Sequence, residues 1–446
     1  MITKVKKREI IKERNLNKKL IWLFLILLIF EGSLRKWVFP GLATPILLVR
    51  EPIAIYFLWI GFKKNWLNNF ICYSTIALAF ISFIATLLFG HQNLLVNVYG
   101  LRIYVIDFPM IFIIPRVLKK EDILKMGRFI IYISIPMTLL IIMQFYSPQS
   151  AWVNRGVGGD IEGGGFSGAL GYFRPPGTFS FTSGFVQFQL LVGSFLLYYI
   201  LNNNHIPLKI RIKKNWLYLA VFCYILTIPY SISRSHLFQT ILLVGFALVG
   251  AFLIGKSLII KNLLYAAFGL TLLGSIILTT NVTGEGMAAF TERFSSATES
   301  EGQGNIVKAL GNRLLYTFGL ENSDKIPFWG YGLGLGTSAG AKLAGGENGF
   351  FSFFNAENES SRILNECGLF IGFLILALRF VFCIQIIKST HLRLRKNKDM
   401  LPWMLLFGAV VMILMGNWGQ PTSLGFVIIF GGFILTSFKD QKKMIK

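Results

Sequence analysis

The sequence has little that could hold a metal ion or build a disulfide framework. Its 446 residues include four cysteines and four histidines. The histidines lack the spacing of metal ligands, and the cysteines fall in apolar runs without close pairing: Cys72, Cys223, Cys367 and Cys383. We therefore expect apolar packing for the cysteines, no metal site and no cofactor.

Acidic residues are also scarce, because 21 Asp and Glu stand against 44 Lys and Arg, for a net charge of +23. A basic excess can indicate a nucleic-acid partner. Here, however, Lys and Arg gather in residues 1–19 and then in alternate loops between apolar runs. That asymmetry follows the positive-inside rule, so the charge indicates topology and attraction to anionic membrane lipids, with no nucleic acid bound.

What the sequence has in abundance is apolar residues, at 54% of the chain with a mean hydropathy of +0.60. A helix that crosses about 30 Å of hydrocarbon needs about 20 such residues. Twelve runs approach this length, which predicts an all-α, polytopic membrane protein of about twelve transmembrane helices. The runs cover residues 20–39, 44–62, 67–89, 94–114, 123–146, 180–201, 216–232, 237–254, 263–279, 362–387, 401–418 and 423–438.

The long polar segment at 280–361 divides the chain. We expect an amino-terminal transmembrane region at 1–279, which carries a smaller outer loop at 147–179, and a carboxyl-terminal transmembrane region at 362–446. An even number of spans and the basic amino terminus place both termini in the cytoplasm and the large, helical loop outside the cytoplasmic (inner) membrane. No small-residue cleavage pattern follows the first run, so it is expected to be a retained helix.

Several charged residues lie in or near the apolar runs, where isolated charge is costly. Glu31 and Arg35 are four residues apart, so on one helix they share a face and can pair. Arg102 and Asp107 lie furthest from the ends of their run and are candidates for lining a buried polar cavity. For the whole set we expect ion pairs between helices: Glu31, Arg35, Arg50, Glu51, Arg102 and Asp107.

The polar segments carry short motifs in a fixed order. Ser233-Arg234 follows the seventh run, and Gly311-Asn312-Arg313 lies in the large loop. A glycine ladder comes next, at Gly330, Gly332, Gly334 and Gly336, and the stretch from Ala356 to Gly372 leads into the tenth run. Their order, spacing and topology together resemble the O-antigen ligase and polymerase superfamily, membrane glycosyltransferases that use polyprenyl-diphosphate-linked glycans.

The resemblance implies roles for individual residues. Arg234 and Arg313 would bind the diphosphate, since a guanidinium is always charged and fits phosphate oxygens with two hydrogen bonds. Glu357 would be the catalytic base or the group that orients the acceptor. Glu359 could make it more basic and is itself expected to bind substrate. Glu357 stands where the ligases place a histidine, which favours a polymerase over a ligase.

Two further residues are expected to bind substrate. Arg174 precedes two prolines that stiffen the approach to the sixth run, and the family often has an arginine here. Tyr331 lies in the glycine ladder and could stack on a sugar face, although interface aromatics are often membrane-belt residues.

The partners implied are a polyprenyl-diphosphate-linked oligosaccharide, an acceptor glycan, membrane lipids and, as further candidates, other polysaccharide-assembly proteins. The reaction would need no metal. Three alternatives stay open: an O-antigen ligase that transfers glycan to a lipid or protein, a small-solute or anion transporter, and a non-catalytic scaffold of an export complex.

Overall fold

The computed structural model describes residues 4–255, 284–302, 326–337, 340–343 and 358–439. This part of the chain is mainly helical. Seven helical stretches are long and apolar enough to cross a membrane, and α16 and α17 are shorter apolar helices. The prediction of a helical membrane protein is therefore confirmed, whereas the number of twelve spans and the large outer loop stay predictions.

The helices follow the apolar runs closely. Eleven of the twelve expected spans overlap a helix, and the ninth, at 263–279, lies outside the described residues. The helices of eight or more residues are α1 (Lys4–Ser33), α3 (Glu51–Lys63), α4 (Phe70–Phe89), α5 (Leu94–Arg102), α6 (Met110–Val117), α7 (Lys120–Tyr146), α8 (Thr182–Asn202), α9 (Lys214–Tyr230), α10 (Arg234–Ile254), α12 (Gly284–Gly302), α15 (Glu359–Asn397), α16 (Met400–Met415) and α17 (Pro421–Ser437).

Short elements join them. Two π-helical turns, η1 (Leu34–Val38) and η3 (Ile103–Asp107), extend α1 and connect α5 to α6. The remaining short helices are η2 (Pro40–Leu42), α2 (Ala43–Ile46), η4 (Trp152–Asn154), η5 (Asn203–His205) and α14 (Gly340–Leu343). One antiparallel ribbon, β1 (Phe166–Ala169) with β2 (Tyr172–Arg174), forms within the glycine-rich outer loop. The prediction of an all-α protein did not include this ribbon.

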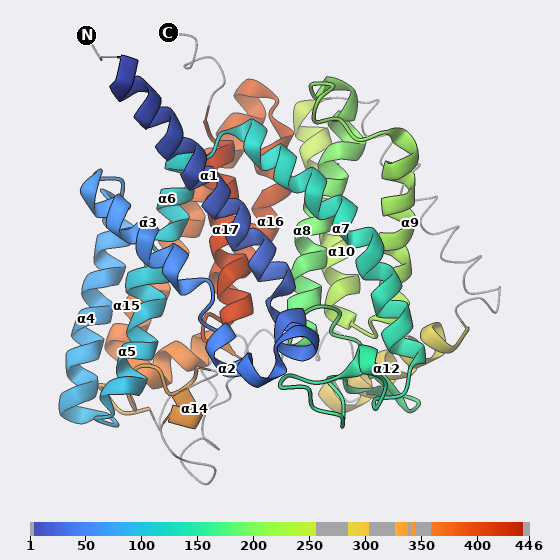
Figure 1. Ribbon diagram of the computed structural model, residues 1–446, viewed down its shortest axis with the longest axis horizontal. Coiled ribbons are helices and arrows are strands. Elements are labelled where there is room, and N and C mark those ends of the chain that lie inside the picture. The colour runs from blue at the N-terminus through green and yellow to red at the C-terminus, as the bar shows by residue number, and fades with distance from the viewer. Residues whose placement is uncertain (1–3, 256–283, 303–325, 338–339, 344–357, 440–446) are drawn as a thin grey trace.

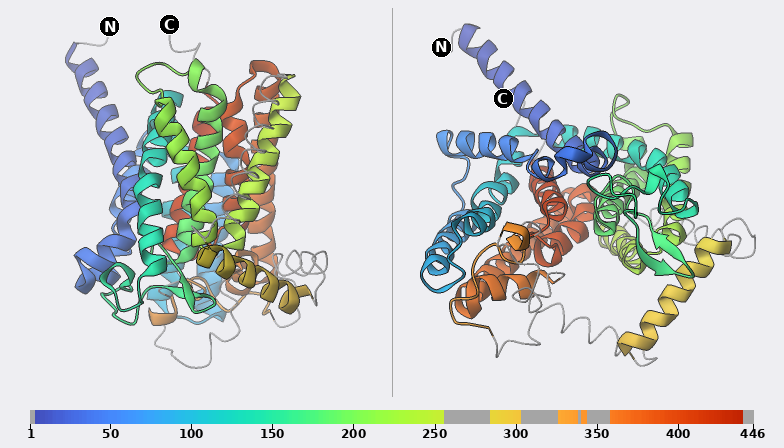
Figure 2. Two further views of the ribbon diagram at one scale, coloured as in Figure 1. Left: turned by 90° about the vertical axis from the view of Figure 1, so that its right-hand side faces the viewer. Right: turned by 60° about the horizontal axis from the view of Figure 1, so that its bottom comes forward.

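The helices stand side by side, and the molecule has two distinct ends (Figure 1). α1 begins and α17 ends at one of them, whereas α2, the β1–β2 ribbon, α12 and α14 lie at the opposite one. Figure 2 shows the same separation from the side, with α12 lying across the helix ends. We call the end with α12 and α14 the loop end.

The centre of the bundle is closely packed around α16 and α17. α17 lies against α6, where a Cβ on Gly432 would come within 2.6 Å of the Ile114 side chain. Small residues of this kind let membrane helices approach one another. Phe426, Phe430 and Phe433 of α17 are fully buried. The centre of the bundle is therefore densely packed.

α15 is not one straight helix. Gly368 has φ 79° and ψ 168°, a conformation that residues with a Cβ rarely adopt. In a straight helix Glu359 and Arg379 would be roughly 30 Å apart, yet Arg379 Nη1 lies 2.8 Å from Glu359 Oε1. The chain therefore folds back at Gly368, and residues 359–367 lie beside the longer helical part.

Candidate functional site at the loop end

Arg234 is the first residue of α10, at the loop end of the bundle. The Ser233 side chain caps this helix by accepting a hydrogen bond from the His236 N–H at 3.4 Å. Ile232, two residues earlier, has φ 46°, which is a true outlier for a β-branched residue. Backbone strain of this kind concentrates at functional sites. The turn before Arg234 is thus held in a conformation that its sequence does not favour.

The β1–β2 ribbon lies beside this turn. A Cβ on Gly168 would come within 3.0 Å of the Ile232 side chain. Arg174, paired with Phe166 at the end of the ribbon, donates from Nε to the Ser167 carbonyl at 3.2 Å. From α12, Nη1 of Arg293 donates to the Gly168 carbonyl at 3.1 Å.

The side chains of Arg174 and Arg293 therefore bind the ribbon, and Arg234 begins α10 two residues after Ile232, which contacts the ribbon. We call Arg174, Arg234 and Arg293 the arginine corner. Sequence reasoning selected the first two and missed Arg293. The sequence signal that could have found Arg293 is the alternation of apolar and polar residues along α12. Ala289 and Phe290 form its buried side.

Tyr331 lies in a different part of the loop end. Its N–H donates to the Asn365 carbonyl at 2.7 Å, and its own carbonyl accepts from the His91 N–H at 3.1 Å. The next residues are held as well, because Leu333 N–H donates to Thr86 Oγ1 at 2.9 Å. The glycine ladder is thus fixed between the end of α4 and the start of α15.

The spacing of glycines in the ladder has a packing reason. A Cβ on Gly330 would lie 2.4 Å from the Gly368 N, and one on Gly368 would lie 2.1 Å from the Phe328 carbonyl oxygen. A Cβ on Gly334 would lie 2.2 Å from the Val96 carbonyl oxygen of α5. Backbone meets backbone at each point, so only glycine fits without a shift.

His91 holds the ladder from the α4–α5 connection. Its Nδ1 accepts from the Asn93 N–H at 3.0 Å, which assigns the proton to Nε2, and Nε2 lies 3.0 Å from the Leu333 carbonyl oxygen. Burial lowers the pKa of His91 below its ordinary value, and the hydrogen bond to Leu333 opposes this only in part. The folded protein therefore favours the neutral form of the His91 imidazole.

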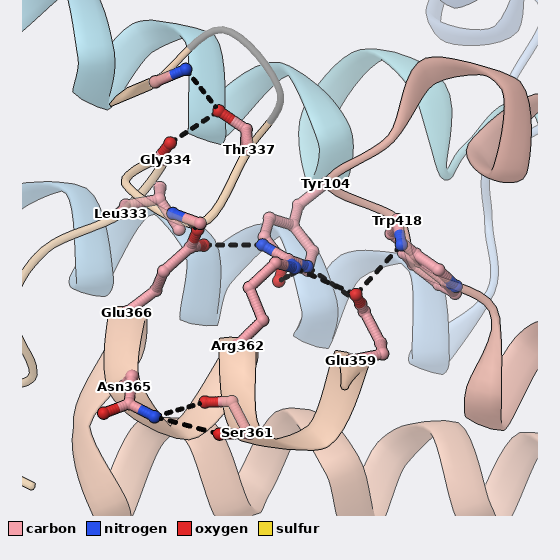
Figure 3. A network of polar contacts seen from close by, with 12 residues as sticks. Tyr104, Leu333, Gly334, Thr337, Glu359, Ser361, Arg362, Asn365, Glu366 and Trp418 are labelled. Carbon is pink, nitrogen blue, oxygen red and sulfur yellow. Dashed lines mark hydrogen bonds and ion pairs between the residues drawn. The ribbon is translucent and has the colours of Figure 1, made fainter. Parts of the chain in front are cut away.

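A buried ionic cluster lies directly beneath the ladder (Figure 3). Arg362 is its centre. This residue donates to both oxygens of Glu359 at 2.8 and 2.9 Å and to Glu366 Oε2 at 2.6 Å. Tyr104 of η3 accepts a longer bond of 3.3 Å from the same guanidinium. Glu366 Oε1 in turn accepts the Gly336 N–H at 2.7 Å. The ladder is tied to α15 through these charges.

Glu359 is enclosed in this cluster. Only 1% of the residue is exposed, and its oxygens also accept from Trp418 N–H at 2.9 Å and pair with Arg379 at 2.8 Å. The Arg379 guanidinium lies 3.4 Å above the Trp418 ring. Two glutamates and two arginines balance, so the four residues form a neutral buried unit. We call Glu359, Arg362, Glu366 and Arg379 the charge cluster.

The charged residues of the first helices pair as expected. Arg50 Nη2 lies 3.0 Å from Glu31 Oε2, and Arg35 Nη1 lies 3.7 Å from Glu31 Oε1. Arg102 pairs with Glu51 and, at 3.4 Å, with Asp107. The prediction of ion pairs between helices is confirmed for Arg50 with Glu31 and for Arg102 with Glu51, whereas the other two pairs are local. Arg102 and Asp107 are both buried.

The structure distributes the selected residues between two places. Arg174 and Arg234 belong to the arginine corner, whereas Tyr331 and Glu359 belong to the ladder and the charge cluster. Arg313 and Glu357 lie outside the described residues. Asn358, which follows Glu357, caps α15 by accepting from the Ser360 N–H at 3.0 Å.

A search against protein-family models gave no match for this chain, and a search of the curated proteins gave none either. Chemical interpretation therefore depends on the arrangement itself. The arginines beside the β1–β2 ribbon suit an anion such as a phosphate, because a guanidinium is always charged. The charge cluster is neutral and buried, which suits a structural role.

Proposed function

We propose that the chain is a membrane glycosyltransferase that polymerises polyprenyl-diphosphate-linked oligosaccharides on the outer face of the cytoplasmic membrane. The observation that carries the proposal is the arginine corner, where the side chains of Arg174 and Arg293 bind the β1–β2 ribbon and Arg234 begins α10 beside it. A lipid diphosphate reaches such a place from the bilayer, and its charge matches theirs. The motif resemblance to the O-antigen superfamily supports the same substrate.

The reaction would proceed by displacement at the sugar's anomeric carbon. An acceptor hydroxyl attacks that carbon, the bond from the carbon to the diphosphate oxygen breaks, and the hydroxyl proton passes to a base. In this proposal Glu357 takes the proton, while Arg234 and Arg313 bind the departing diphosphate. Preorganised charge of this type contributes about 3 to 4 kcal/mol per donor in well-studied cases. No metal is required, because the arginines neutralise the leaving group.

Glu359 takes a different role in this proposal. Its carboxylate is buried and engaged by Arg362, Arg379 and Trp418, so it acts as a positioning residue. These contacts fix the start of α15. Tyr331, half-buried and held by its backbone, stays a candidate for stacking on sugar.

The proposal is tested by Arg234→Ala and Arg313→Ala in cells that depend on this protein for surface polysaccharide. We expect normal membrane expression and loss of the long-chain ladder on a gel. Arg395→Ala is the matched control, because Arg395 is exposed at the opposite end of α15. Full-length ladders from both test variants at normal expression would refute the assignment. Transfer of single repeats to a lipid or protein would indicate a ligase instead.

A transporter is the second candidate, because six charged residues are paired inside the first helices. Ionisable groups at this depth often mark solute or ion paths. Uptake of a small anion by proteoliposomes, with no glycan product from purified lipid-linked substrate, would select it. A scaffold role would instead leave polysaccharide unchanged when Arg234 and Glu357 are both replaced.

A further inference from the structure

A small pocket lies at the end of the bundle opposite the loop end, where α1 begins and α17 ends. Its lining comes from the α3–α4 connection, from α6 and from the end of α17. Phe112, Pro115 and Leu435 contribute apolar surface, and Arg116 and Lys439 contribute two cations. The pocket therefore combines apolar surface with positive charge.

The size and the position of the pocket favour part of a lipid. Its volume is about 200 Å³, whereas pockets for a whole small molecule usually measure about 300 to 1,000 Å³. Two candidate membrane spans end beside it, at Phe70 and at Val117. Trp66 also lines it, and tryptophan is enriched at the level of the lipid headgroups. A headgroup in the adjoining leaflet is therefore within reach.

Positive charge is concentrated around Lys439. Partial burial lowers the pKa of Lys439 to about 8, and three neighbouring cations act in the same direction: Arg116, Arg14 and Lys119. Like charges that lie close together disfavour one another's charged form. An anion bound among these side chains would relieve that repulsion.

The protein does not supply this anion within the part of the chain that the structure describes. Asp122 is the carboxylate that acts on Lys439, but its Oδ2 already lies 2.6 Å from Lys18 Nζ. Arg116 is exposed and makes no ion pair with a described residue. A guanidinium binds phosphate oxygens with two hydrogen bonds, so Arg116 is suited to a phosphate from outside the chain.

Asn69 adds a neutral donor to the lining. Its Oδ1 caps α4 by accepting from the N–H groups of Ile71 and Cys72 at 2.9 and 3.3 Å. These two bonds fix the side chain and leave Nδ2, a donor, as its remaining polar group. The polar lining contributed by Asn69, Arg116 and Lys439 thus donates hydrogen bonds, as an oxyanion requires.

We propose that this pocket binds the phosphate headgroup of an anionic phospholipid such as phosphatidylglycerol. Arg116 and Lys439 contact the phosphate, and the glycerol end of the lipid packs on Phe112 and Leu435. Basic pockets between membrane helices commonly bind such headgroups. The bound lipid joins the α3–α4 connection to the end of α17. The site is independent of the reaction proposed for the loop end.

The test maps where such a lipid binds. The full chain is placed in phosphatidylcholine nanodiscs with a small amount of phosphatidylglycerol that carries a photoreactive group on its headgroup. Cross-linked peptides are identified by mass spectrometry. The test variant combines Arg116→Gln with Lys439→Gln. The control combines Lys388→Gln with Arg395→Gln, because these exposed residues near the end of α15 do not line the pocket.

We expect cross-links within residues 64–69 and 110–117 in the unchanged protein and in the control. In the test variant the yield from these peptides should fall by about tenfold or more, because charge-assisted hydrogen bonds are lost. Arg116→Lys keeps the charge without the paired hydrogen bonds, so its yield should be intermediate. Equal yields in the test variant and the control, or peptides only from other segments, would overturn the proposal.

Competition identifies the ligand. Unlabelled phosphatidylglycerol should remove the cross-link, whereas additional phosphatidylcholine should not, and equal competition by both lipids would overturn the proposal. Inorganic phosphate is compared with sodium chloride at the same ionic strength. If phosphate alone removes the cross-link, the pocket binds free phosphate and the lipid assignment is wrong. Unchanged melting temperatures show that the variants fold, and Arg116→Lys keeps the test valid if the double variant does not.

Discussion

The backbone N–H of Gly336 donates to Oε1 of Glu366 at 2.7 Å. The other oxygen of the same carboxylate accepts from Arg362 at 2.6 Å. One side chain thus fixes the glycine ladder and neutralises a buried guanidinium. The ladder, the start of α15 and the α16–α17 connection form a single unit at the loop end, because Glu359 of the same cluster accepts from Trp418.

Glu366→Ala should strongly destabilise the protein. The substitution removes the oxygen that accepts the Gly336 N–H and one of the two carboxylates that neutralise the buried Arg362. Breaking such a buried ion pair typically costs about 3 to 5 kcal/mol of stability. We expect a clear drop in the melting temperature of the detergent-purified protein. Glu121→Ala is the control, because Glu121 pairs with Lys125 on an exposed face, where a pair is worth about 1 kcal/mol or less. Equal melting temperatures would contradict a supporting role for the cluster.

Gly368→Ala tests the fold-back of α15. A Cβ there would lie 2.1 Å from the Phe328 carbonyl oxygen, at a φ of 79°. Because backbone cannot move away as a flexible side chain can, we expect reduced expression and a lower melting temperature. Gly245→Ala is the matched change in a helix, with nothing within 4 Å, and should stabilise the protein by up to about 1 kcal/mol. If both substitutions behave alike, the close contact is not real.

His91 should make stability depend on pH. Its pKa is lowered in the folded protein, so the unfolded chain takes up a proton first as the pH falls. Stability from the neutral imidazole is therefore present above the ordinary value of 6.5 and declines as the pH falls from there toward the lowered value. His91→Gln keeps an N–H donor for Leu333 but cannot titrate. Melting curves at pH 7.5 and 5.5 should show a smaller pH effect in this variant, and an unchanged pH effect would rule out His91 as a source.

Glu359→Gln and Arg234→Ala should distinguish a residue that stabilises the fold from one that acts in the reaction. Glu359→Gln leaves Arg362 and Arg379 without a full counter-charge, so we expect a lower melting temperature and less polysaccharide together. Arg234→Ala should lose polysaccharide at nearly unchanged melting temperature, since Arg234 lies half-buried at a helix start. If Glu359→Gln keeps its melting temperature and still loses polysaccharide, Glu359 contacts substrate, as the family resemblance implies.

The apolar runs were sufficient to predict where most helices lie. The run at 180–201 became α8, Thr182–Asn202, because a helix that faces hydrocarbon needs only continuous apolar residues. The run at 44–62 was divided instead. Pro52 lies in the first turn of α3, a favoured place for proline, so the helix starts at Glu51 after a separate turn. Composition alone did not show this break.

The arrangement of the site was less predictable, because it depends on contacts between distant segments. Arg379 was a readable signal, since a charge within an apolar run needs a partner. Its partner Glu359 is twenty positions away and comes near only because α15 folds back at Gly368. Sequence reasoning placed Gly368 in a motif but treated 362–387 as one straight span. Arg293 was missed because α12 has no motif to mark it.

Reconstitution tests the central claim most directly. The purified chain in liposomes would be given a polyprenyl-diphosphate-linked oligosaccharide from the matching organism, and the products would be separated by size on a gel. The account predicts chains of several repeats and released polyprenyl diphosphate with the unchanged protein, and neither with Arg234→Ala or Arg313→Ala. Unreacted substrate with the unchanged protein, when the same liposomes take up a small anion, would contradict it.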